Sequence, residues 1–247
     1  MAARYRGLLL DLFGTLISFD ARRLPELELD GATYRTTVGG LGPALAAWVP
    51  GVSLAAFARA LRVVSEELAR TRAGDHVELP SRERFRRALA RVDCAAGALS
   101  EAAVDLSRAH MALIAAATVL PPAHAELLAA LAPRYRLGVV SNFDDTTTAY
   151  DILVRHGIVR HLDTVVISEA LGLRKPHPAV ARAGLRGLRL DAGEVLLVGD
   201  TYGEDVAGAR AAGVDAAWID AQGGGVPEGA VPPRYVLGAL PELAGIL

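Results

Sequence analysis

Gly7-Leu8-Leu9-Leu10, followed by Asp11-Leu12-Phe13-Gly14-Thr15-Leu16, is the stretch that indicates the fold of this 247-residue chain. A continuous apolar run of this length predicts a strand buried on both faces. Later apolar runs likewise stop at a small or polar residue; they are Leu137–Val140 before Ser141, Thr164–Ile167 before Ser168, Val195–Val198 before Gly199-Asp200, and Ala216–Ile219 before Asp220. Segments with helical spacing separate these runs, at residues 122–132, 146–156, 178–188 and 204–212. Alternating strands and helices predict an α/β fold with a doubly wound, Rossmann-like parallel sheet.

One long segment interrupts this alternation. Helical patterns cover residues 54–71, 81–92 and 100–116, and Asp30-Gly31 is a strong signal for a hairpin turn between residues 27–29 and 33–36. We therefore expect a core of residues 1–16 and 118–247 and a mainly helical insert of residues 17–117 with an N-terminal hairpin. The apolar side chains of Trp48, Phe57, Leu61 and Leu68 are expected to form the inner core of the insert.

The composition argues against several kinds of partner. A formal net charge of -2, without a basic stripe, argues against nucleic acid. No stretch reaches the ~18 apolar residues that span a bilayer, so no membrane association is expected. The single cysteine, Cys94, and the lack of a secretory signal pattern favour a reducing compartment, and we expect a cytoplasmic protein. The sequence makes no prediction of oligomeric state.

Polar residues stand where the predicted strands end. Asp11, Ser141 and Asp200 occupy such positions, and in open parallel sheets ligands bind beyond the carboxyl ends of the strands. Lys175 is the only lysine among the 26 lysine and arginine residues. An ammonium is a compact point charge, whereas a guanidinium is a wide planar fork, so Lys175 is expected at a site with room for a single cation.

Four segments resemble, in order, the four motifs of the haloacid dehalogenase-like hydrolase superfamily; they are Asp11–Leu16, Ser141-Asn142, Lys175 before Pro176, and Gly199–Asp205. The helical insert corresponds to the cap domain of that family. The resemblance implies that Asp11 is a nucleophile and that Thr15 orients it by a hydroxyl hydrogen bond. It also implies that Ser141 and Asn142 bind oxygens of the transferred group, while Lys175 binds and neutralises its charge.

Acids in the fourth motif predict a metal site. Asp200 and Asp205, together with Asp11 and the backbone carbonyl of Phe13, offer the hard oxygen ligands that suit Mg²⁺, and Glu204 could replace or supplement Asp205. Phosphatases of the family carry such acids. The resemblance therefore implies an Mg²⁺-dependent phosphatase that acts on a small phosphorylated metabolite through an aspartyl-phosphate.

Phe13 departs from the phosphatase pattern. The phosphatases of the family have a second aspartate there as general acid and base, whereas its dehalogenases have an aromatic residue. One alternative is a metal-free 2-haloacid dehalogenase with a halide bound by Arg22, Arg23 or Arg35. Another is a catalytically weak protein that binds a phosphorylated ligand. A phosphatase without the second aspartate needs a leaving group that departs unaided, a proton from the substrate, or a substitute acid, for which Asp20, Glu26 and Asp145 are candidates.

Overall fold

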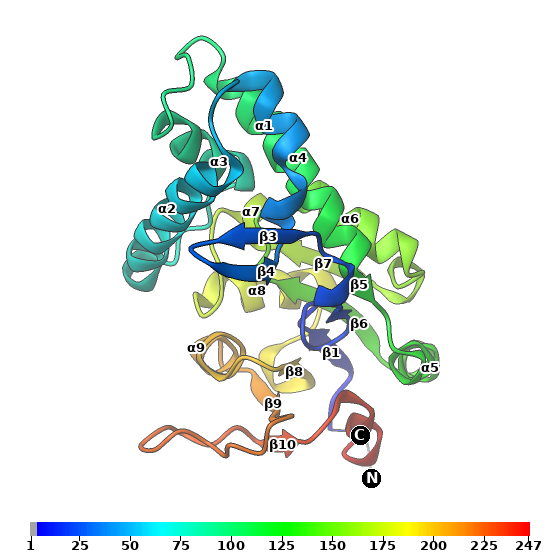
Figure 1. Cartoon of the computed structure of the whole chain (residues 1–247). Coiled ribbons are helices and arrows are strands. Elements are labelled where there is room, and N and C mark those ends of the chain that lie inside the picture. Colours follow the sequence, from blue (N-terminus) through cyan, green and yellow to red (C-terminus); the bar gives the residue numbers. More distant parts are fainter. Residues whose placement is uncertain (1–3) are drawn as a thin grey trace. The chain divides into compact units, whose positions relative to one another are not determined.

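The computed structural model describes residues 4–247, which form two compact units (Figure 1). Unit 1 contains the residues up to Ser18 together with Val119–Leu247, and unit 2 is Phe19–Thr118. The short strands β2 (Ser18–Phe19) and β5 (Thr118–Val119) pair with each other where the chain passes from one unit to the other. None of the helices in the described part of the chain combines the length and hydropathy needed to cross a bilayer.

Unit 1 is built on a six-stranded sheet with the order β10-β9-β8-β1-β6-β7, in which every neighbouring pair is parallel. Its strands are β1 (Gly7–Leu10), β6 (Arg136–Ser141), β7 (Thr164–Ile167), β8 (Val195–Gly199), β9 (Asp215–Ile219) and β10 (Tyr235–Leu237). The predicted α/β fold with a doubly wound parallel sheet is confirmed. In the centre of the sheet, Leu10 lies beside Val139 of β6 and Val198 of β8. Asp11, Ser141 and Asp200 therefore lie together at the carboxyl ends of these parallel strands.

Helices cover the sheet of unit 1. They are α5 (Pro122–Leu131), α6 (Thr146–Arg155), the single turn α7 (Ser168–Leu171), α8 (Pro178–Leu188) and α9 (Ala207–Ala211). On the face of α8 and α9, Leu9, Val140 and Leu197 pack with Val180 and Val206, while α5 lies on the other side of the sheet (Figure 1). The helix expected over residues 204–212 begins differently: a π-helical turn, η5 (Tyr202–Val206), precedes α9.

Unit 2 contains a hairpin and a helical bundle. The hairpin pairs β3 (Glu26–Leu29) with β4 (Ala32–Arg35), and both turn residues, Asp30 and Gly31, have positive φ, as the Asp-Gly signal predicts. The helices are α1 (Gly42–Trp48), α2 (Leu54–Asp75), α3 (Ser81–Ala90) and α4 (Leu99–Ala117). Phe57, Leu61 and Leu68 are buried in their common core, and Trp48 packs against it, as expected.

Candidate active site

Asp11 follows β1 directly and is only 6% exposed. The next residues form a tight loop, in which the amides of Leu16 and Ile17 both donate to the carbonyl of Leu12. Gly14 has φ +85°, and a Cβ at this position would lie 2.2 Å from Oδ2 of Asp200. Only glycine therefore allows the loop after Asp11 to approach Asp200 this closely.

Lys175 lies at the centre of the site and is 2% exposed. Its Nζ donates to Oδ1 of Asp11 at 2.6 Å, to Oδ1 of Asp205 at 2.6 Å and to the carbonyl of Val140 at 2.9 Å. An ammonium has three N–H donors, so these contacts use all of them. Burial alone would lower the pKa of Lys175, but the adjacent carboxylates of Asp11 and Asp205 outweigh it and raise the pKa. Lys175 therefore carries a fixed positive charge against the carboxylate of Asp11.

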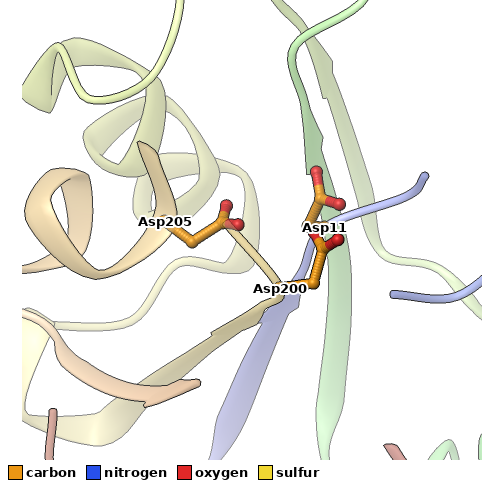
Figure 2. A group of neighbouring side chains, drawn as sticks. All are labelled: Asp11, Asp200 and Asp205. Atoms are coloured by element: carbon orange, nitrogen blue, oxygen red, sulfur yellow. The ribbon is translucent and has the colours of Figure 1, made fainter. Parts of the chain in front are cut away.

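Three carboxylates surround this charge. Asp11, Asp200 and Asp205 each offer an oxygen within 4.8 Å of the others, and Figure 2 shows Asp205 directed toward Asp11 and Asp200. Burial raises the pKa of Asp11 to about 7 despite Lys175, and Asp205 adds to the rise. Burial and Asp205 also raise the pKa of Asp200. Three carboxylates, two of them buried, beside one ammonium leave surplus negative charge, which suits a hard divalent cation.

Hydrogen bonds hold Asp205 by its carboxylate and Asp200 by its backbone carbonyl. Asp205 is 1% exposed, and its Oδ2 accepts from the amide of Thr201 at 3.0 Å while its Oδ1 accepts from Lys175. The indole of Trp218 donates to the carbonyl of Asp200 at 2.9 Å. Both carboxylate oxygens of Asp205 are thus hydrogen-bonded, whereas among residues 4–247 the side-chain hydrogen bond to the carboxylate of Asp200 is a weak one, from the Thr201 hydroxyl at 3.4 Å.

The side-chain amide of Asn142 is hydrogen-bonded to the backbone of Lys175. Its Oδ1 accepts from the amide of Lys175 at 2.7 Å, and its Nδ2 donates to the carbonyl of Lys175 at 3.0 Å and to Oε2 of Glu204 at 2.8 Å. Arg174 donates to the other oxygen of Glu204 at 2.9 Å. The Asn142 side chain, which the resemblance assigns to substrate binding, therefore holds the backbone of Lys175. Glu204, which the sequence offered as an alternative metal ligand, accepts hydrogen bonds from Asn142 and Arg174. The sequence reasoning missed this role because both partners are remote in the chain.

Two buried hydroxyls complete the site. Thr15 and Ser141 are each 1% exposed, and neither hydroxyl oxygen has a hydrogen-bond partner among residues 4–247. The expected bond from Thr15 to Asp11 is therefore absent from the structure. A buried polar group without a partner costs about 1–3 kcal/mol, and a ligand that accepts from both hydroxyls would remove that cost.

The ring of Phe13 packs against Phe143, with 4.8 Å between centroids and an interplanar angle of 32°. Asp145, on the same loop as Phe143, caps α6 by accepting from the amide of Thr148 at 2.8 Å. A site with this pair beside the nucleophile has an aromatic surface where the phosphatase pattern has a carboxyl group.

The other candidate acids and the candidate halide-binding arginines belong to unit 2, where they pair with each other. Asp20 pairs with Arg22 at 2.8 Å and with Arg23 at 3.5 Å, and Glu26 pairs with Arg35 at 2.6 Å. The hydrogen bond from Arg22 holds the pKa of Asp20 below its usual value, which disfavours proton donation by that carboxyl.

The family of the chain follows from comparison with known proteins. The model of the haloacid dehalogenase-like hydrolases matches residues 5–213, which include all four motifs. The chain belongs to this family. It is therefore a hydrolase with a haloacid dehalogenase-like core.

Relatives include several named phosphatases. The chain is 33% identical over 76 residues to glyceraldehyde 3-phosphate phosphatase of Pyrococcus abyssi, which is 31% of this chain and 32% of that protein. It is 41% identical over 126 residues to phosphoglycolate phosphatase of Rhodospirillum rubrum, covering 50% and 51% of the two chains. Haloacid dehalogenase-like hydrolase domain-containing protein 3 of Bos taurus is 38% identical over 93 residues, or 38% of this chain and 36% of the relative. These matches thus span between about a third and half of each relative.

Solved structures share the fold over nearly the whole chain. A 2-haloacid dehalogenase from Pseudomonas syringae has a TM-score of 0.70 at 21% identity and covers 98% of this chain and 97% of its own. The magnesium-bound HAD-hydrolase YfnB from Bacillus subtilis has a TM-score of 0.66 at 20% identity and covers 99% of both chains. At this identity the likeness concerns the fold alone.

Proposed function

We propose that the chain is an Mg²⁺-dependent phosphatase that acts on a small phosphorylated metabolite through an aspartyl-phosphate on Asp11. The observation that carries the proposal is the cluster of Asp11, Asp200 and Asp205 around Lys175, where buried carboxylates outnumber the one ammonium. The phosphatase names of the Pyrococcus abyssi and Rhodospirillum rubrum relatives support it.

The cluster fits a magnesium ion by the chemistry of its donors. Asp11 and Asp200 would hold the ion, with Asp205 and the backbone carbonyl of Phe13 as further oxygen donors. Bound there, Mg²⁺ supplies positive charge against the oxygens of a phosphoryl group. Asp200 is the ligand least engaged by the protein itself, since Asp205 already accepts from Lys175 and Thr201.

Each of the site residues has a distinct role in the proposed reaction. Asp11 attacks phosphorus with a carboxylate oxygen and forms the aspartyl-phosphate, which water then hydrolyses. Lys175 keeps Oδ1 of Asp11 in place and balances the charge that gathers around it. The hydroxyls of Thr15 and Ser141, which have no partner among the described residues, donate to the phosphoryl oxygens.

A second candidate function is supported by one observation. The Phe13–Phe143 pair beside Asp11 matches a metal-free 2-haloacid dehalogenase, in which a halide leaves carbon without a proton. That function leaves Lys175 as the one cation beside three carboxylates. The phosphatase accounts for more of the site, and we therefore favour it.

Hydrolysis assays separate the two functions. The purified chain is incubated with p-nitrophenyl phosphate or acetyl phosphate, with Mg²⁺ or with a chelator, and separately with 2-chloropropionate. We expect phosphate release that requires Mg²⁺, no halide release, and no activity of either kind in Asp11→Asn. Halide release that is indifferent to the chelator would establish the dehalogenase instead, and retained turnover in Asp11→Asn would remove Asp11 from the role of nucleophile.

Calorimetric titration with Mg²⁺ tests the metal site without turnover. Asp200→Asn should weaken Mg²⁺ binding at least tenfold. The matched control is Asp220→Asn, which removes the same charge at the end of β9, where Asp220 accepts from the amides of Gly224 and Gly225. Equal Mg²⁺ affinity in the two variants would contradict the assignment of Asp200.

A further inference from the structure

The residues assigned to the site around Asp11 supply charge and hydroxyls, and none of them is free to donate a proton to a departing oxygen. The three N–H groups of Lys175 are committed to Asp11, Asp205 and Val140. Asp205 accepts with both oxygens, and Asp200 is assigned to the cation. Hydroxyls such as those of Thr15 and Ser141 are too weakly acidic to act as proton donors at neutral pH.

The aromatic pair occupies the part of the loop where a donor would be useful. Phe13 lies two residues after Asp11, and its ring contacts Phe143 from the loop after β6 at 4.8 Å between centroids. Both rings are half-buried. Two acids, Asp144 and Asp145, follow Phe143 in the chain, and Asp145 is engaged as the cap of α6. The two rings therefore present hydrocarbon close to the nucleophile.

Leaving groups differ in their need for a proton. When a P–O bond to an alkyl alcohol breaks, the departing alkoxide is a strong base, and a positioned general acid is worth about 10²–10⁴ in rate. A carboxylate or an acidic phenolate departs as a stable anion without help. A site without a proton donor therefore favours substrates whose leaving group is a carboxylate or an acidic phenolate.

We propose that this site hydrolyses phosphates whose leaving group departs as a stable anion, acyl phosphates above all, and discriminates against phosphate esters of alkyl alcohols. This inference rests on the proposed phosphatase function. It separates the chain from relatives whose names give alkyl phosphate esters, glyceraldehyde 3-phosphate and phosphoglycolate, as substrates.

Both steps balance without a general acid. In the first, the bond from the Asp11 oxygen to phosphorus forms as the P–O bond to the substrate carboxylate breaks, and the electron pair leaves with that carboxylate. In the second, water attacks phosphorus, the Asp11 carboxylate departs, and the proton of the water passes to a phosphoryl oxygen. The aspartyl-phosphate is itself an acyl phosphate, so its leaving group also needs no proton.

The dependence of kcat/KM on the leaving group tests the inference. Phosphate release is measured with Mg²⁺ for acetyl phosphate, for 2,4-dinitrophenyl, 4-nitrophenyl and phenyl phosphates, and for glycerol 3-phosphate. We expect kcat/KM to rise steeply as the phenol becomes more acidic, and to be at least 100-fold higher for acetyl phosphate than for glycerol 3-phosphate. Asp145→Asn, which keeps an oxygen to cap α6, should show the same slope as the unchanged chain.

The outcomes separate this inference from the function on which it rests. A flat dependence on the phenol, or turnover of glycerol 3-phosphate within tenfold of acetyl phosphate, would overturn the inference and leave the phosphatase intact. A flat dependence that becomes steep in Asp145→Asn would overturn it and identify Asp145 as the acid. No phosphate release from any substrate would overturn both proposals.

Discussion

Replacing Asn142 with alanine should slow turnover while leaving substrate affinity nearly unchanged. The amide of Asn142 makes three hydrogen bonds, two to the backbone of Lys175 at 2.7 and 3.0 Å and one to Glu204 at 2.8 Å. Each such bond contributes about 1 kcal/mol net, so the variant should lose roughly 3 kcal/mol of stability. The loss falls on the segment that holds the ammonium against Asp11.

The magnitude of the kinetic effect follows from that position. If about half of the lost energy appears as misplacement of the Lys175 charge in the transition state, kcat falls at least tenfold, since about 1.4 kcal/mol corresponds to a factor of ten. KM should change less than threefold, because both donors of the Asn142 amide are already used and none is left for the oxygens of a phosphoryl group. Kinetics with acetyl phosphate and thermal unfolding followed by circular dichroism measure the two effects separately.

The matched control is Asp163, just before β7, whose side chain bonds to the opposite end of β6 from Asn142. Asp163 accepts from the amide of Leu137, near the start of β6, at 2.9 Å. Asp163→Ala should lose about 1 kcal/mol of stability with kcat and KM unchanged. A tenfold rise in KM with unchanged kcat in Asn142→Ala would show that Asn142 binds substrate directly. A kcat equal to that of the control would show that the hydrogen bonds from Asn142 to Lys175 are not needed.

Three other buried features give predictions that concern stability and metal binding. Burial and Arg84 lower the pKa of His110 to about 3, so the unfolded chain binds one more proton than the folded one between pH ~3 and ~6.5. The contribution of His110 to stability should therefore fall by about 1.4 kcal/mol per pH unit from pH ~6.5 down to pH ~3. Urea unfolding should show it as a difference in slope of this size between the unchanged chain and His110→Gln, and equal slopes would exclude His110 as a cause. Gly14→Ala puts a Cβ 2.2 Å from Oδ2 of Asp200 at a positive φ, so calorimetry should show weaker Mg²⁺ binding, and unchanged affinity would contradict the placement of Asp200. Phe57→Ala should cost about 3–5 kcal/mol in urea unfolding, because the ring is fully buried against Phe85; a loss below 1 kcal/mol would mean that this core repacks.

Much of the fold could be predicted because the decisive patterns are local. The apolar runs that became β1, β6 and β8 are buried on both faces, and a continuous run is the signature of such strands. The edge strand β10 escaped notice, since Tyr235–Leu237 has only three residues and one of them is exposed. The π-helical turn at Tyr202–Val206 also escaped, because apolar spacing alone does not distinguish it from the first turn of an α-helix.

The sequence predicted which residues lie together at the site, but it did not predict the hydrogen bonds between them. Sequence position placed Asp11, Ser141 and Asp200 at one edge of the sheet, because parallel strands end there together. It did not reveal that the Asn142 amide faces the backbone of Lys175, because an amide can serve a ligand or a peptide group equally well. The choice depends on a partner 33 residues away along the chain, which only the folded structure brings into reach.

The use of lysine at this one position follows from the geometry around Nζ. Three acceptors, on Asp11, Asp205 and Val140, surround a single nitrogen at 2.6 to 2.9 Å in a place that is almost fully buried. An ammonium satisfies all of them with its three donors. A guanidinium spreads five donors over a plane, so at least two would be buried without a partner, at a cost of about 1–3 kcal/mol each. A chain that otherwise uses arginine for every fixed cation therefore has a physical reason to keep lysine between these two carboxylates.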